Sequence, residues 1–190
     1  MRALVYYVAT TIDGYIAAPD GAYEFFPLAD DLGEFLHARY PETLPTAYRQ
    51  ALGKDDEPNG RFDTVVMGRG TYDPAYLHGI TSPYAHLRQI VFSRSVGPRA
   101  DVEVVDGDPA AYVRELKQQD GGDIWLCGGG DLAGQLLDEI DEFIVKLNPI
   151  VAGDGIPLVR HGFDPRRLEL AESRAFGSGV VLLRYLSTAR

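Results

Sequence analysis

The sequence predicts an α/β fold built on a mostly parallel sheet, with an antiparallel hairpin at its C-terminal end. Strand-like and helical patterns alternate as far as residue 141, as they do in the strand–helix–strand units of parallel sheets. Residues 65–67 and 90–92 are continuous apolar runs, which are typical of strands covered on both faces. After residue 141 the strands follow one another directly, and a Gly-Ser-Gly turn at 177–179 separates the last two.

Eight strands are expected, at residues 2–9, 63–67, 89–93, 102–105, 123–127, 142–151, 167–176 and 179–187. About four flanking helices are expected: one over 30–39, one over 71–77, one that opens at Asp108, and one after the glycines at 128–130 that continues to Ile140. Asp30, Thr71 and Asp108 are of types that cap helix N-termini, and Pro109 suits a first helical position.

One domain is expected to span residues 1–190, because 45% hydrophobic and 24% charged residues are ordinary globular proportions. A chain of this length buries a core without disulfides. Residues 40–61 interrupt the pattern with three prolines (Pro41, Pro45 and Pro58) and the charged run at 54–57. We expect this segment to be a solvated surface insertion rather than a functional cluster of charges.

The composition narrows the classes of partner. A net charge of −10 and a pI near 4.8 argue against nucleic acid or an anionic membrane, and no apolar run approaches the roughly 18–20 residues of a membrane span. The single cysteine, Cys127, forms neither a disulfide nor a cysteine-based metal site within one chain, and the four histidines lack ligand spacing. We therefore expect a cytoplasmic protein that binds no metal.

The most informative stretch is residues 123–137, where a short apolar strand runs into Gly128, Gly129 and Gly130 and a helix follows. Glycines let the backbone approach a ligand closely, and a helix start offers unpaired N–H groups and a positive dipole end. This arrangement is typical of sites for nucleotide phosphates. The spacing matches G-x-G-x-x-G/A, but the acidic residue that this motif needs about 20 positions later is missing. An NADP pocket built on arginines fits better.

Two more strand ends suit phosphate binding. Residues 67–72 read Met-Gly-Arg-Gly-Thr-Tyr, and Ser-Arg follows the strand at 90–92. Ligands of α/β sheets bind at the carboxyl ends of strands, and arginine makes charge-assisted bonds to phosphate. The 2′-phosphate of an adenosine ribose would suit Arg94 with Arg69 or Ser93, although an ordinary turn with a surface arginine explains either segment alone. The candidates here are Gly68, Arg69, Gly70, Thr71, Ser93 and Arg94.

Two acidic positions near the N-terminus are candidates on the substrate side. Asp13 and Gly14 leave the first strand as a pair common in turns. On the helix at 30–39, Asp31 precedes Leu32, and Phe35 lies one turn along. An acid and two apolar groups would therefore face a common pocket.

These segments together resemble the dihydrofolate reductase superfamily, and within it the branch related to the C-terminal reductase domain of bacterial riboflavin biosynthesis. The resemblance covers nearly the whole chain. It rests on the order of Thr-Ile-Asp-Gly-Tyr-Ile-Ala (11–17), Met-Gly-Arg-Gly-Thr-Tyr (67–72), Val-Phe-Ser-Arg (91–94), Gly-Gly-Gly (128–130), Gly-Asp-Gly-Ile-Pro-Leu (153–158) and Ser-Gly-Val-Val (178–181). It implies an eight-stranded dihydrofolate reductase-like sheet, NADPH bound across the strand ends, a cis peptide in the Gly-Gly pair and a homodimer.

The resemblance also implies residue roles. Ala9 and Ile16 would lie by the nicotinamide, the strand-end candidates by the phosphates and ribose, and the helix from Asp131 by the pyrophosphate. Asp31, Leu32 and Phe35 match the spacing of a pterin-binding acid and its apolar partners. Two departures stand out: the tryptophan usual before this helix is missing, and Tyr7 stands where the riboflavin reductases imply a lysine.

We therefore expect an NADPH-dependent reductase that transfers hydride to a small heteroaromatic (pterin- or pyrimidine-like) or carbonyl substrate. Asp31, or a water held by Asp31 or Asp13, is the expected proton source, and Leu32 and Phe35 are expected to contact the substrate. Two alternatives keep the same fold: a non-catalytic protein that binds NADPH, and one that binds flavin or another nucleotide. Fold alone does not decide between them.

Overall fold

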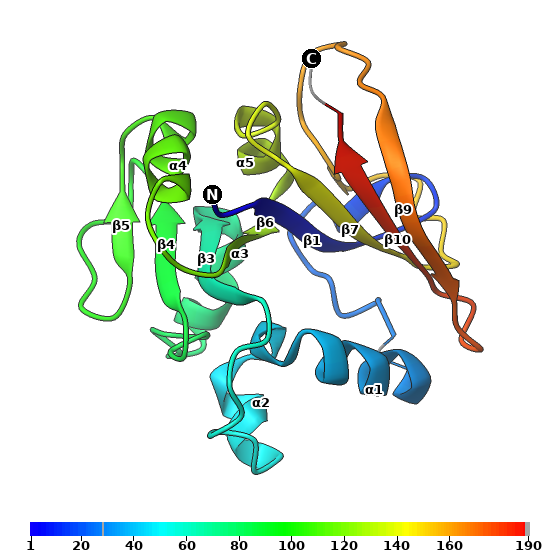
Figure 1. Ribbon diagram of the computed structural model, residues 1–190, viewed down its shortest axis with the longest axis horizontal. Coiled ribbons are helices and arrows are strands. Elements are labelled where there is room, and N and C mark those ends of the chain that lie inside the picture. The colour runs from blue at the N-terminus through cyan, green and yellow to red at the C-terminus, as the bar shows by residue number, and fades with distance from the viewer. Residues whose placement is uncertain (28, 189–190) are drawn as a thin grey trace.

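A computed structural model describes residues 1–27 and 29–188 and has an eight-stranded sheet at its centre (Figure 1). Its strands are β1 (Leu4–Thr10), β3 (Phe62–Gly68), β4 (Arg88–Phe92), β5 (Glu103–Val105), β6 (Asp123–Gly128), β7 (Glu142–Leu147), β9 (Leu168–Ala175) and β10 (Val181–Ser187). They lie in the order β5-β4-β3-β6-β1-β7-β10-β9. The first six in this order run parallel, whereas β10 and β9 are antiparallel to their neighbours. The predicted fold class is confirmed.

A second, two-stranded sheet was not predicted. It pairs β2 (Tyr15–Ala17) with β8 (Ile156–Pro157). The strand predicted over 142–151 in fact ends at Leu147, because Pro149 has no backbone N–H to continue the ladder. The chain leaves β7 there and returns past β2. Gly155 has a φ of +156°, and a Cβ on it would lie 2.3 Å from the Ala17 carbonyl oxygen, so this crossing requires glycine.

Five α-helices flank the sheets: α1 (Asp30–Arg39), α2 (Thr46–Ala51), α3 (Arg69–Leu77), α4 (Pro109–Lys117) and α5 (Gly130–Gln135). Asp108 caps α4 as predicted, since its carboxylate accepts a 2.9 Å hydrogen bond from the Ala110 N–H. The other two predicted caps are wrong. Ala29 takes the N-cap position of α1, and α3 begins two residues early, which puts Thr71 in its first turn. No helix within the described ranges is long and apolar enough to cross a membrane.

Each face of the sheet carries its own apolar core. The chain alternates along β1, so that Tyr6 packs on the face covered by α4 and α5 and Tyr7 on the face covered by α1 and α3 (Figure 1). The helix after the glycines stops at Gln135, yet Leu136 and Ile140 still reach the first core from the turns that follow. This double coverage explains the continuous apolar runs in the central strands.

Residues 40–61 depart from the prediction of a solvated insertion. The prediction is wrong for residues 41–51, which form a 3-10 turn (Pro41–Thr43) and α2. Pro41 takes the first position of the 3-10 turn, which proline favours, and Pro45 is the N-cap residue of α2. Glu42 is fully buried, and its carboxylate accepts hydrogen bonds from the N–H groups of Gly60, Arg61 and Phe62 at 2.7–2.9 Å. This clamp closes the segment onto the start of β3; residues 52–60 between are mostly exposed.

Paired charges lie at the amino ends of the central strands. Arg61, just before β3, bonds Asp123 at the start of β6 (2.8 Å) and Glu142 at the start of β7 (2.7 Å). Arg184 on β10 contacts Glu142 as well, and Arg2 pairs with Asp63. The carboxylates raise the pKa of Arg61 above its usual range despite the cost of burial. This network fixes the register of adjacent strands at the end where they begin.

Replacing Glu42 with alanine should destabilise the fold strongly. Three partly or fully buried N–H groups lose their acceptor, and each such loss costs about 1–3 kcal/mol, so we expect a free energy of unfolding lower by about 3 kcal/mol and a Tm lower by about 6–12 °C. Thermal and denaturant unfolding measure both quantities. Glu34→Ala, on the exposed side of α1, is the matched control and should change stability by less than about 0.5 kcal/mol. Equal effects of the two substitutions would contradict the clamp.

Candidate functional site

A cavity of about 1680 Å³ runs along the carboxyl ends of β1, β3, β4 and β6. Its other walls come from the loop after β2, from α1, and from residues 43–50 around α2. A pocket for one drug-sized ligand measures about 300–1000 Å³. This cavity therefore has room for an extended cofactor and a second molecule beside it.

The sheet topology explains why the glycine-rich segments meet here. β6 lies between β1 and β3, so three strand ends from distant parts of the sequence come together. The structure brings every residue predicted to bind cofactor to the wall of this cavity. These residues are Ala9, Ile16, Gly68, Arg69, Gly70, Thr71, Ser93, Arg94, Gly128, Gly129, Gly130 and Asp131.

The end of the cavity beside β4 carries positive charge. Arg94 is exposed and has neither an ion-pair nor a hydrogen-bond partner among residues 1–27 and 29–188. Arg69 donates to Ser95 Oγ at 2.8 Å, and its ion pair with Asp73 is long, at 3.5 Å. Both guanidinium groups are thus available to an anion.

The glycine turn after β6 packs closely against α3. The Gly128–Gly129 peptide is cis, as the family resemblance implies. A Cβ on Gly128, whose φ is +146°, would lie 3.3 Å from Thr71 Oγ1, and one on Gly129 would lie 3.6 Å from it. No side chain caps the start of α3. Bare backbone and one hydroxyl therefore form this part of the wall, as a closely approached phosphate requires.

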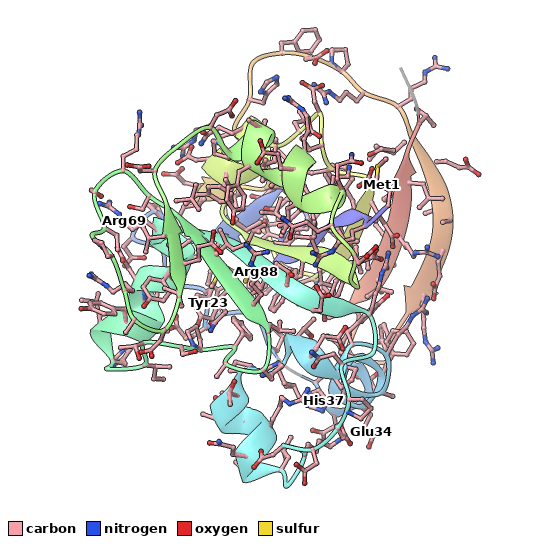
Figure 2. The ribbon with its side chains drawn as sticks, turned by 60° about the vertical axis from the view of Figure 1, so that its left-hand side comes forward. Met1, Tyr23, Glu34, His37, Arg69 and Arg88 are labelled. Atoms are coloured by element: carbon pink, nitrogen blue, oxygen red, sulfur yellow. The ribbon has the colours of Figure 1, made fainter. Side chains whose placement is uncertain are left out.

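Three residues labelled in Figure 2 mark the extent of the cavity. Arg69 comes from α3, Tyr23 from the loop after β2, and His37 from α1, and all three line it. In that view Tyr23 lies between the other two, and Glu34 lies beside His37. The cavity thus extends from the arginine end to a second end under α1.

This second end is aromatic and contains a lysine. Trp125 on β6 donates from Nε1 to the Tyr7 carbonyl oxygen at 3.2 Å and contacts the rings of Tyr7 and Tyr84. Lys146 on β7 places its Nζ 4.0 Å from the centroid of the Tyr7 ring. Burial lowers the pKa of Lys146 to about 8 and raises the pKa of Cys127 to about 12. Lys146 is not among the site residues predicted from the sequence, although a charge within the apolar run Phe-Ile-Val-Lys-Leu is a visible signal.

The residues predicted on the substrate side do not line this cavity. Asp31 Oδ2 accepts a 2.7 Å hydrogen bond from the Gly177 N–H in the β9–β10 hairpin. Leu32 is buried in the core under α1, and Phe35 packs edge-on against Phe176, with ring centroids 5.4 Å apart. The helix turns Leu32 toward the sheet, and Asp31 consequently faces the hairpin. The expected common pocket for these three residues is not formed.

Asp13 also has a structural position. Its carboxylate accepts hydrogen bonds from the Thr11 hydroxyl (2.6 Å) and from the N–H groups of Ala152 (3.1 Å) and Gly153 (2.7 Å). These bonds, first that from Thr11, lower the pKa of Asp13 to about 2. They tie the turn after β1 to the loop after β7. The catalytic role of Asp31 and the substrate contacts of Asp13, Leu32 and Phe35 stay predictions.

Within the part of the chain that the structure describes, no three His, Cys, Asp or Glu side chains lie close enough to hold a metal ion. His86 donates or accepts at both ring nitrogens, with Thr46 Oγ1 and the Glu42 carbonyl oxygen, so it belongs to the packing of α2.

Comparison with known proteins agrees with this geometry. The family model of the RibD C-terminal domain matches residues 2–182. The chain belongs to the RibD C-terminal domain family. Two relatives from Bacillus subtilis (strain 168) are the uncharacterized proteins YwjB, 30% identical over 95% of this chain and 96% of its own, and YyaP, 25% identical over 97% and 94%.

Solved structures show the same fold. A putative riboflavin biosynthesis protein from Shewanella sp. PV-4 matches with a TM-score of 0.66 and 24% identity over 98% of this chain and 99% of its own. The deaminase/reductase of Thermotoga maritima matches with a TM-score of 0.65 and 18% identity, but only over 57% of its chain. Dihydrofolate reductase from Enterococcus faecalis, complexed with NADP(H), matches with a TM-score of 0.67 and 13% identity over 97% of its chain. These likenesses show that the chain has a dihydrofolate reductase-like fold.

Cys127 should react slowly with alkylating reagents in the folded protein. The thiolate is the reactive form, and a pKa of about 12 leaves little of it at pH 7.5. We expect iodoacetamide to modify the native protein at least about 100-fold more slowly than the chain unfolded in guanidinium chloride. Intact mass measures the rate, and Cys127→Ser, which removes the one cysteine, is the control for reaction elsewhere. Similar rates in both states would show that the thiol is not desolvated.

Proposed function

We propose that the protein is an NADPH-dependent reductase acting on a small heteroaromatic or carbonyl compound. The observation that carries this proposal is the convergence of three glycine- or arginine-bearing strand ends on one cavity with room for two molecules. Membership of the RibD C-terminal domain family supports it, as does the likeness of fold to a dihydrofolate reductase complexed with NADP(H).

The residues of the cavity fit such a cofactor. Arg94, with Arg69 and Ser93, would hold the 2′-phosphate and the adenosine ribose at the β4 end. The backbone of Gly128–Gly130 and the start of α3 would hold the pyrophosphate, where added side chains would crowd Thr71. Ala9 and Ile16 would border the nicotinamide. When bound, NADPH supplies the hydride, and the protein's part is to orient the acceptor, exclude water and deliver a proton.

A non-catalytic NADPH-binding protein is the second candidate. The engagement of Asp31 by the Gly177 N–H favours it, because the acid expected to serve catalysis is occupied in the fold. For either function we propose a small-molecule ligand, a cytoplasmic setting and the homodimer that the family resemblance implies.

The cofactor proposal predicts a preference for NADPH over NADH that depends on Arg94. Quenching of Trp125 fluorescence should show NADPH binding at least about tenfold more tightly than NADH, since a charge-assisted bond to the 2′-phosphate is worth roughly a tenfold change or more. Arg94→Gln should weaken NADPH binding about tenfold and leave NADH binding unchanged.

Arg88→Gln is the matched control for that measurement. Arg88 is an equally exposed arginine at the opposite end of β4 and pairs with Glu103 (Figure 2), so its substitution should leave the NADPH affinity as it is. Thermal stabilisation by FMN but not by NADPH would overturn the proposal in favour of a flavin. If NADPH, NADH and FMN all fail to bind or to stabilise the protein, the assignment of a nucleotide site to this cavity is contradicted.

A further inference from the structure

The aromatic end of the cavity contains a cation without an anionic partner. Among the described residues no carboxylate lies within ion-pair distance of Lys146 Nζ, and Nζ makes no hydrogen bond to them. Its contact is the face of the Tyr7 ring, at 4.0 Å from the centroid. A ring face stabilises an ammonium group less than a carboxylate or water does. A half-buried lysine held this way on the wall of a cavity is available to an electron-rich atom of a ligand.

The register of the sheet places this lysine beside the expected position of the nicotinamide. Lys146 is the direct partner of Ala9 across the β1–β7 ladder. Both residues line the cavity, with Ile16 nearby in the same wall. An acceptor that meets the hydride-donating ring at Ala9 would therefore lie within reach of the lysine side chain.

We propose that Lys146 binds an oxygen atom of the acceptor and donates the proton that completes its reduction, so that the acceptor is a planar compound bearing a carbonyl or ring oxo group. This inference rests on the proposed function and names the substrate class for the same cavity. Planarity follows from the walls beside the lysine, which are the rings of Tyr7, Tyr84 and Trp125.

Atoms and electrons are conserved in the proposed reduction of the carbonyl group. Hydride from the dihydronicotinamide forms a C–H bond at the carbonyl carbon, and the two electrons of the C=O π bond move to oxygen. Oxygen takes a proton from Lys146 Nζ, whose N–H bond breaks. The products are the alcohol, NADP⁺ and a neutral amine, which recovers its proton from solvent.

No other group around the lysine competes for this role. The titratable side chains around it are Tyr7 from β1, Cys127 from β6 and Tyr84 from the segment before β4. Burial raises the pKa of all three, so all three are neutral at pH 7. On β10 its ladder partner is the apolar Leu182, and α1 presents Leu32 and Leu36 to the same core. Asp31 is bonded to the hairpin. Lys146, with a pKa lowered by burial to about 8, is protonated at pH 7 and loses its proton readily.

The test compares 1-indanone with indane, two ring systems that differ only in a carbonyl group replaced by a methylene group. Binding of each to the NADP⁺-loaded protein is measured by calorimetry in the wild type, Lys146→Met and Lys146→Arg. We expect the oxo compound to bind the wild type about tenfold or more tightly than its partner. Lys146→Met should abolish that preference, and Lys146→Arg should retain most of it. Lys54→Met, on the exposed segment before β3, is the matched control.

Different results would contradict the role of Lys146 and the proposed function. Absence of a preference in the wild type, or a preference that survives in Lys146→Met, overturns the assignment of Lys146. Failure of NADP⁺ to bind any of these proteins overturns the proposed function instead. Acetic anhydride labelling read by peptide mass should give Lys146 a midpoint near pH 8, well below the ordinary lysine value of about 10.4. A Lys146 midpoint near that ordinary value would remove the proton transfer and leave at most an oxygen-binding cation.

Discussion

The placement of β6 between β1 and β3 is the constraint on which the site depends. Parallel strands present their carboxyl ends at one edge, and this insertion brings the Gly128–Gly130 turn between two segments that lie more than fifty residues earlier. The carboxylates of Asp123 and Glu142 hold the other edge through Arg61. Because the register is fixed at the amino ends of the strands, the opposite edge of the sheet can carry glycines and unpaired cations.

Charged residues that stabilise the fold and charged residues that line the cavity differ in whether they have ion-pair partners. The chain carries a net charge of −10, yet two cations at the cavity, Arg94 and Lys146, have no acidic partner among the described residues. At the amino ends of the strands, by contrast, Arg61 and Arg184 share Glu142. A cation buried without an anionic partner is costly, and an exposed one such as Arg94 stays available to an anionic ligand. Their positions, one at each end of the cavity, match the two ends of a bound cofactor and acceptor.

Much of the fold could be predicted from hydrophobic periodicity and turn residues. Most of the predictions that proved wrong have an identifiable physical cause. The main strands, the Asp108 cap and the hairpin at 177–179 were visible because each depends on local chemistry. Hydrogen bonds between residues far apart in the sequence could not be predicted in this way. The burial of Glu42 depends on three N–H groups eighteen or more residues away, and the occupation of Asp31 depends on Gly177. Lys146 was missed because its significance arises only when β7 aligns it with Ala9.

We infer that one cavity takes NADPH across the strand ends, with its nicotinamide at Ala9 and Lys146. A crystal structure of the NADP⁺ complex tests this placement. We expect the 2′-phosphate against Arg94, the pyrophosphate over Gly128–Gly130, and the nicotinamide between Ala9 and the aromatic end. A cofactor bound in the reverse direction, or outside this cavity, would contradict both the proposed function and the role of the lysine.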